Sequence, residues 1–172
     1  MLKKITLMLA ILLAGCTTLK NPPSTVAHVD LNKYAGKWYE ISSFPNSFQR
    51  GCQCTTATYA LQGDQVNILN RCYKGAKRKP SQAKGRAWPV NAANSQLKVQ
   101  FFWPFRGDYW VLYLDPDYKQ VLVGSPNRKY LWVLSRTPHI SKERYQLIEK
   151  VAKRKGYDIT KLVKTRQDCW KK

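Results

Sequence analysis

The chain has 172 residues, which is room for one ordinary domain and not for a second, catalytic one. Its composition of 44% hydrophobic, 12% aromatic and 23% charged residues excludes wholesale disorder. The 30 Lys and Arg outnumber the 10 Asp and Glu, so the formal net charge of +20 predicts attraction to anionic surfaces.

The N-terminus predicts export. Lys3 and Lys4 precede an apolar run, Ile5 to Ala14, that is too short to span a bilayer. Leu13-Ala14-Gly15-Cys16 follows and resembles the lipobox of bacterial lipoproteins, in which the Cys thiol accepts diacylglycerol. We therefore expect Cys16 to be the lipidation site, with several acyl chains as the membrane anchor. The competing interpretation is a buried N-terminal helix that ends at a free Cys.

This assignment divides the chain into three parts. Residues 1–15 are expected to be a lipoprotein signal peptide, and residues 16–29 an acylated N-terminus and flexible tether, because Pro22-Pro23 lies in a stretch without periodicity. By resemblance to sorted lipoproteins, Thr17 favours the outer membrane, with the domain facing the periplasm. An exported chain is a poor candidate for binding nucleic acid, the partner that its charge and aromatic content otherwise suggest.

Four other cysteines remain for an oxidising compartment: Cys52, Cys54, Cys72 and Cys169. An even number predicts two disulfides, and three pairings are open. A metal site is the alternative, because two of the thiols are only two residues apart. Their spacing is not that of the common zinc motifs, so we expect neither a metal nor a cofactor.

From Lys37 onwards, short stretches rich in aromatic and β-branched residues alternate with Gly, Pro, Asn and Asp, which predicts antiparallel sheet. Eight strands suffice to close a barrel. The predicted strands are 37–44, 54–61, 65–73, 83–90, 96–103, 109–114, 119–124 and 130–136.

After the strands the hydrophobic period changes to that of a helix. Ser141 is a typical N-cap and Gly156 a typical end, so we expect one helix over about 142–155. Its apolar stripe, which includes Ile148 and Val151, predicts packing against the outside of the barrel. The tail from Leu162 to Cys169 has room for a further short strand.

Three ordered segments resemble the motifs of the lipocalin family: Gly36-Lys37-Trp38-Tyr39-Glu40, Asp115-Pro116-Asp117-Tyr118, and the stretch 130–138 that contains Arg136. With the lipobox, the chain is similar to the bacterial outer-membrane lipoprotein lipocalins, which are apolipoprotein D-like. The resemblance implies an all-β fold, an eight-stranded antiparallel up-and-down barrel with one C-terminal α-helix packed outside. It also implies structural roles for Gly36, Trp38 and Arg136, the last two stacked across the closed end of the barrel.

The same resemblance implies one disulfide pairing. The cysteine of apolipoprotein D that matches Cys54 is tied to the C-terminal tail, here Cys169, which leaves Cys52 to pair with Cys72. Hairpin arithmetic disagrees, because a tight turn at Gly63-Asp64 would place residue 54 nearly opposite residue 72. Cys54–Cys72 with Cys52–Cys169 therefore stays open as the alternative.

The resemblance further implies a lipid-binding cup, with a fatty acid or lysophospholipid as the ligand to be stored or transported. We expect Arg106, in the loop 104–107, to meet the headgroup. Alternation shows which residues share a face of a strand and not which face borders a cavity, so each candidate could instead be core or rim. The candidates for the lining are Trp88, Phe101, Trp103, Tyr109 and Trp132.

An enzyme is the rival class and finds little support. The two histidines are His28, in the expected tether, and His139, at the helix entry, and neither belongs to a catalytic motif. We therefore expect no catalytic residue. The alternative function is an envelope interaction protein whose basic surface binds anionic glycolipids. The sequence leaves the oligomeric state open.

Overall fold

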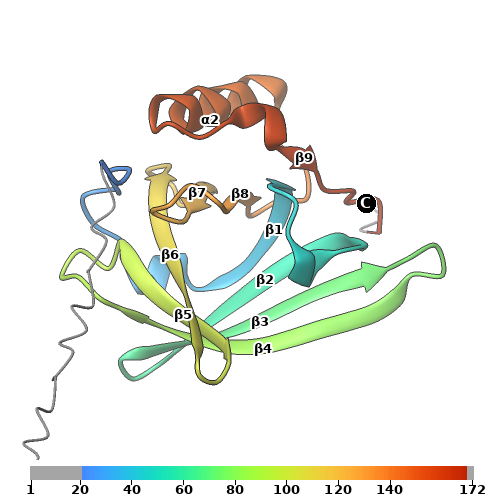
Figure 1. The fold of residues 1–172 in the computed structure, drawn as a ribbon, viewed down its shortest axis with the longest axis horizontal. Helices are drawn as coiled ribbons and strands as arrows, with labels where there is room; N and C mark the ends of the chain where they lie inside the picture. The colour runs from blue at the N-terminus through green and yellow to red at the C-terminus, as the bar shows by residue number, and fades with distance from the viewer. Residues whose placement is uncertain (1–20, 170–172) are drawn as a thin grey trace, which may run out of the picture.

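In a computed structural model, which describes residues 21–169, the protein folds into a closed antiparallel β-barrel (Figure 1). Each barrel strand pairs with its neighbours in the sequence, and β1 pairs with both β8 and β2, which closes the sheet. The predicted eight-stranded barrel is confirmed. The strands are β1 (Gly36–Ser43), β2 (Cys52–Gln62), β3 (Gln65–Lys74), β4 (Lys79–Pro89), β5 (Gln96–Phe102), β6 (Phe105–Leu114), β7 (Gln120–Gly124) and β8 (Leu131–Ser135), and the tail adds the predicted short strand, β9 (Val163–Lys164).

The expected helix, α2 (Lys142–Arg154), lies outside the barrel across β7 and β8 (Figure 1). Ser141 is its N-cap and accepts a hydrogen bond from the backbone N–H of Arg144. The buried face of α2 packs on the outward side chains of the strands beneath. Three short helices complete the fold: α1 (Leu31–Tyr34), η1 (Ser47–Gln49) and η2 (Ile159–Lys161).

Strand alternation divides the apolar residues into two cores. Val121 and Val123 of β7 point into the barrel, whereas Leu122 between them is buried under α2 with Ile148 and Ala152. The strands nearest α2 are therefore apolar on both faces. This explains the almost continuous hydrophobic sequences of β7 and β8.

Three strands begin two to four residues earlier than predicted. β2 starts at residue 52 rather than 54, β4 at 79 rather than 83, and β6 at 105 rather than 109. The additional residues form the ends of hairpins that reach beyond the core, where Lys74 pairs with Lys79 and Phe102 with Phe105. Backbone pairing there needs no apolar alternation, so the sequence pattern did not reveal it.

The C-terminal tail completes the barrel wall between β1 and β2. These strands pair only from Gly36 to Tyr39, and beyond that point β9 pairs with β1. The backbone N–H of Cys54 donates to the carbonyl oxygen of Arg166 at 2.6 Å. The Gln167 amide donates to the carbonyl oxygens of both Glu40 and Thr55, at 2.7 and 3.0 Å.

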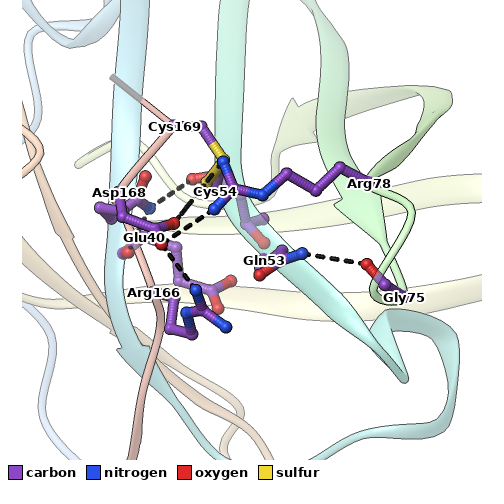
Figure 2. Close-up of a disulfide and its surroundings, with 10 residues drawn as sticks. Glu40, Gln53, Cys54, Gly75, Arg78, Arg166, Asp168 and Cys169 are labelled. Carbon is purple, nitrogen blue, oxygen red and sulfur yellow. Dashed lines mark hydrogen bonds and ion pairs between the residues drawn. A yellow bond between two sulfur atoms is a disulfide. The ribbon is translucent and has the colours of Figure 1, made fainter. Parts of the chain in front are cut away.

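Two disulfides hold this region: Cys52–Cys72, and Cys54–Cys169, which Figure 2 shows. The pairing implied by the resemblance is confirmed, and the alternative is wrong. The register of β2 against β3 shifts between Gln53 and Thr56, and Cys54 has a φ of 53° at this bulge. The bulge carries Cys54 towards the tail. Cys54, Asp168 and Cys169 lie close together and are residue types that can bind a metal ion. The two cysteine sulfurs, however, are bonded to each other.

Residues 21–29 do not form the flexible tether that we expected of 16–29. Val29 is fully buried, Val26 packs against the interior core, and the Val26 N–H donates to the carbonyl oxygen of Val111 at 2.9 Å. Apolar side chains and backbone pairing fix this segment to the barrel although its sequence has no periodicity. The signal peptide 1–15 and Cys16 lie outside the described residues.

The two disulfides should stabilise the fold unequally. Cys54–Cys169 spans a sequence separation of 115 and Cys52–Cys72 one of 20, so loop-closure entropy gives about 5 and about 3 kcal/mol respectively. Replacing both Cys54 and Cys169 by Ala should lower the free energy of unfolding more than replacing both Cys52 and Cys72. Urea titration of the two variants and the wild type measures the difference. Equal losses would contradict this ranking by loop length.

Candidate ligand-binding site

Arg136 and Trp38 close one end of the barrel. Trp38 is completely buried, and the guanidinium carbon of Arg136 lies 3.9 Å from the centroid of its ring. The guanidinium also donates to the carbonyl oxygens of Lys33, Lys37 and Tyr118, at 2.7, 3.0 and 3.2 Å. Gly36 has a φ of 95°, and a Cβ there would lie 3.2 Å from Arg136. These contacts make this end a plug rather than an entrance.

Three tyrosines lie above the plug. The Tyr109 hydroxyl is hydrogen-bonded to those of Tyr34 and Tyr59, at 2.6 and 3.0 Å. Burial raises the pKa of Tyr59 to about 12 and raises the pKa values of Tyr34 and Tyr109 well above their ordinary value. The phenols therefore form a neutral floor whose hydroxyl groups satisfy one another.

A small apolar void of about 20 Å³ lies beside these rings. That volume suits about one water molecule and not an acyl chain. The closed end therefore has no room for an acyl chain, and we call the opposite, open end of the barrel the mouth. The wall of the void includes Val29, Val66, Ile68, Ala87, Leu97 and Val111.

A buried carboxylate lies on the inner face above this floor. Glu40 is only 6% exposed, and its donors among the described residues are neutral. Its Oε1 accepts from the hydroxyls of Ser43 and Thr165, at 3.1 and 2.6 Å. Its Oε2 accepts from Gln49 at 2.7 Å, and Gln49 in turn accepts from the Trp132 indole N–H at 2.9 Å. A carboxylate has about four acceptor positions, and three donors meet Glu40 among residues 21–169.

Two more acceptors lie nearby. Ala57 of β2 lies opposite Trp38 of β1 on one side and opposite Asn70 of β3 on the other. Because residues opposite each other share a face of the sheet, the Asn70 side chain belongs to the inner face. Thr55 lies two residues from Ala57 on the same strand. Within residues 21–169, the Thr55 hydroxyl and the Asn70 side-chain oxygen are buried without a hydrogen-bond partner. Together with Glu40 they form what we call the acceptor belt.

The interior positions predicted for Phe101, Tyr109 and Trp132 agree with the structure, because all three pack against the interior core. Phe101 lies over Gly85, where a Cβ would come within 2.7 Å of its ring. Trp132 stacks on Tyr130 with the ring centroids 5.8 Å apart. Phe101 and Trp132 therefore flank the path from the mouth to the floor.

Trp88, Trp103 and Arg106 do not line the interior. Trp88 follows the inward Ala87 and points outside, where the Arg106 guanidinium lies 5.1 Å from its ring. Trp103 is 82% exposed at the tip of the β5–β6 hairpin. The earlier start of β6 places Arg106 on the outer face, two residues before Asp108, so it is not the interior headgroup partner that we expected.

The sequence pattern did not predict the acceptor belt or the role of Gln49. One signal was available: Glu40 lies two residues after Trp38 in the quoted motif, and strand alternation gives both the same face. Nothing in the sequence distinguishes Thr55 or Asn70 from a polar residue that faces water.

The comparisons with known proteins agree with this geometry. The family model described as a lipocalin-like domain matches residues 29–167. The chain is a lipocalin. Lipocalins are typically binding carriers rather than enzymes, and the barrel with its external helix is their fold.

Relatives of this lipocalin come from bacteria, plants and animals. It is 40% identical over 163 residues to the outer membrane lipoprotein Blc of Escherichia coli K12, with 92% of each chain covered. It is 42% identical to temperature-induced lipocalin-1 of Arabidopsis thaliana, covering 87% of this chain and 86% of that one. Identity to apolipoprotein D of Macaca fascicularis is 32%, with coverage of 91% and 84%.

Solved structures show the same fold at lower identity. Lobster apocrustacyanin A1 aligns with a TM-score of 0.67 and 21% identity, covering 85% of this chain and 90% of that one. Insecticyanin of Manduca sexta aligns with the same TM-score and 19% identity, covering 86% and 84%. In the part of this lipocalin that the structure describes, no helix has the length and apolar character needed to cross a membrane.

The tyrosine floor predicts a specific loss of stability in alkali. Up to about pH 10 the phenols are neutral in both the folded and the unfolded chain. As pH rises from about 10 through 12, Tyr59 ionises first in the unfolded chain, so the free energy of unfolding falls by about 2–3 kcal/mol from this residue alone. Urea midpoints measured across this range should fall less steeply for Tyr59→Phe than for the wild type. Identical slopes would contradict the assignment.

Proposed function

We propose that this lipocalin carries a single-chain lipid, a fatty acid or lysophospholipid, in a bacterial envelope. Acyl chains on Cys16 would anchor it to the outer membrane, with the barrel facing the periplasm. The observation that carries the proposal is the interior of the barrel: one end is plugged, and the inner face carries a buried carboxylate and two buried polar atoms without a hydrogen-bond partner. The lipobox and the likeness to proteins named outer membrane lipoprotein support the location.

The acceptor belt favours a lysophospholipid over a fatty acid. Glu40 and Asn70 offer oxygen atoms that accept hydrogen bonds, and the Thr55 hydroxyl can accept or donate one. An unpaired buried polar group costs about 1–3 kcal/mol. The free hydroxyl of a lysophospholipid glycerol donates to such atoms. A fatty acid would instead bring its carboxylate to the level of the Glu40 carboxylate, where two like charges repel at low dielectric.

The remaining parts of a lysophospholipid suit the adjoining layers. Its chain would lie between Phe101 and Trp132, above the tyrosine floor, where each buried methylene contributes up to about 0.8 kcal/mol before ordering costs. Its phosphate would lie above the belt, at the mouth. There the chain offers cations such as Arg50 and Lys129.

Binding should depend on the inner wall and not on the outer one. We expect a lysophospholipid with a chain of about 16–18 carbons to bind with a Kd of about 1 μM or below. Trp132→Ala should weaken this binding about tenfold, because it removes part of the surface that the acyl chain contacts. Trp88→Ala, on the outer face, is the matched control and should bind as the wild type does. Fluorescence titration of delipidated, disulfide-intact protein gives both values, and circular dichroism verifies the fold. Absence of saturable binding would remove the basis of the carrier proposal.

The same titration tests the belt. Glu40→Gln should improve the binding of a fatty acid relative to a monoacylglycerol of equal chain length, because the substitution removes the negative charge and leaves the apolar wall unchanged. Improvement of both ligands to the same extent would argue against the belt as the position of the headgroup.

The anchor is tested at Cys16, whose thiol is the acylation point of the lipobox. Cys16→Ser should leave either uncleaved precursor or a protein without acyl chains. Detergent phase partitioning of envelope fractions, together with the mass of the mature N-terminus, distinguishes these products from the wild type. Normal processing and membrane retention of the variant after a high-salt wash would overturn the lipoprotein assignment.

A further inference from the structure

The tip of the β5–β6 hairpin exposes three aromatic side chains to water. Phe102, Trp103 and Phe105 are 72%, 82% and 77% exposed, and Pro104 lies between them. Soluble proteins rarely leave so large a contiguous apolar surface in water unless it meets a partner. Other exposed large apolar residues of the described chain, such as Leu61 and Val90, are isolated at the opposite end of the barrel.

This tip lies at the mouth. In an up-and-down barrel the loops β1–β2, β3–β4, β5–β6 and β7–β8 share one end, and the plug and α1 occupy the other. Two further exposed rings border the same opening: Phe48 of the β1–β2 loop and Tyr130 of the β7–β8 loop, with centroids 5.7 Å apart. The entrance to the ligand site is thus bordered by aromatic side chains.

Charge is distributed unequally between the two ends. The mouth loops 44–51, 75–78, 103–104 and 125–130 contain no acidic residue. The segments at the closed end contain Asp30, Asp64, Asp115 and Asp117. Aromatic rings interspersed with cations are the composition that favours the headgroup layer of an anionic bilayer. The cations of the mouth loops are Arg50, Lys77, Arg78, Arg128 and Lys129, of which Arg78 is already paired with Asp168 of the C-terminal tail at 2.9 Å.

The N-terminal segment leaves the barrel on this same side. The Arg128 guanidinium donates to the carbonyl oxygen of Asn21 at 2.8 Å, and the Lys155 ammonium donates to that of Ser24 at 2.7 Å. Asn21 therefore lies beside the β7–β8 loop. Cys16 is five residues earlier, and five residues of chain reach at most about 18 Å. Acyl chains on Cys16 would enter the membrane close to the mouth.

We propose that the mouth of the barrel docks face down on an anionic lipid bilayer, with Phe102, Trp103 and Phe105 inserted in the headgroup layer. The anchor position in this inference rests on the proposed acylation of Cys16, whereas the aromatic tip and the cationic loops stand independently of it. In this orientation a single-chain lipid passes between bilayer and barrel without crossing water.

Quenching of Trp103 tests the docking. Acylated full-length protein is reconstituted in vesicles of phosphatidylethanolamine and phosphatidylglycerol, with or without lipids brominated near the headgroup. The fluorescence of Trp103 is obtained as the difference between the wild type and Trp103→Phe. It should fall roughly twofold when the vesicles contain brominated lipid. Phe102→Ser with Phe105→Ser should abolish this loss, and the matched control at the closed end, Leu61→Ser with Val90→Ser, should retain it.

Each other outcome overturns the proposal. Trp103 that is quenched by aqueous acrylamide and not by brominated lipid lies in water, so the mouth does not touch the membrane. Trp103 shielded from both quenchers is covered by protein, which would make the tip an interface between copies of the chain. Protein that does not float with the vesicles would overturn the acylation together with the docking, whereas floating protein with a water-exposed Trp103 overturns the docking alone.

Discussion

The stacking of Arg136 on Trp38 is the contact on which the rest of the site depends. One guanidinium covers the indole and donates to carbonyl oxygens from α1, β1 and the β6–β7 turn, so it joins segments about a hundred residues apart in the chain. Hydrogen bonds from a charged donor contribute about 1.5–3 kcal/mol each. Because this end is sealed, the tyrosine floor stays dry and the other end of the barrel becomes the entrance.

A second constraint comes from the incomplete pairing of β1 with β2. The gap between them is filled by the C-terminal tail, which supplies Thr165 to the Glu40 carboxylate and Gln167 to the backbone on both sides. The salt bridges of Asp168 with Arg78 and Arg166 are exposed and contribute little (Figure 2). The disulfide and the buried hydrogen bonds hold the tail, so the stability of the wall and the geometry of the acceptor belt are coupled.

The sequence predicted the architecture well because alternation, turn residues and three motifs agreed with one another. It placed Phe101, Tyr109 and Trp132 correctly on the inner face, since each alternates with polar neighbours or shares a face with Arg136. It misplaced Trp88 and Arg106, because a period of two defines two faces and does not say which one is inside. The acceptor belt was not predictable, because an inward polar residue looks like an outward one. The packing of residues 21–29 depends on contacts distant in sequence.

The inserted tail also determines the order in which the fold can be completed. A chain that enters an oxidising compartment N-terminus first exposes Cys52, Cys54 and Cys72 long before Cys169 arrives, 115 residues after Cys54. Until then the wall of the barrel is incomplete, and Cys54 is free to pair with Cys52 or Cys72. Correct folding therefore requires Cys54 to remain reduced until the tail is in place, or thiol–disulfide exchange to release it from an early pairing. A truncation before β9 would leave Cys54 unpaired and the wall between β1 and β2 open.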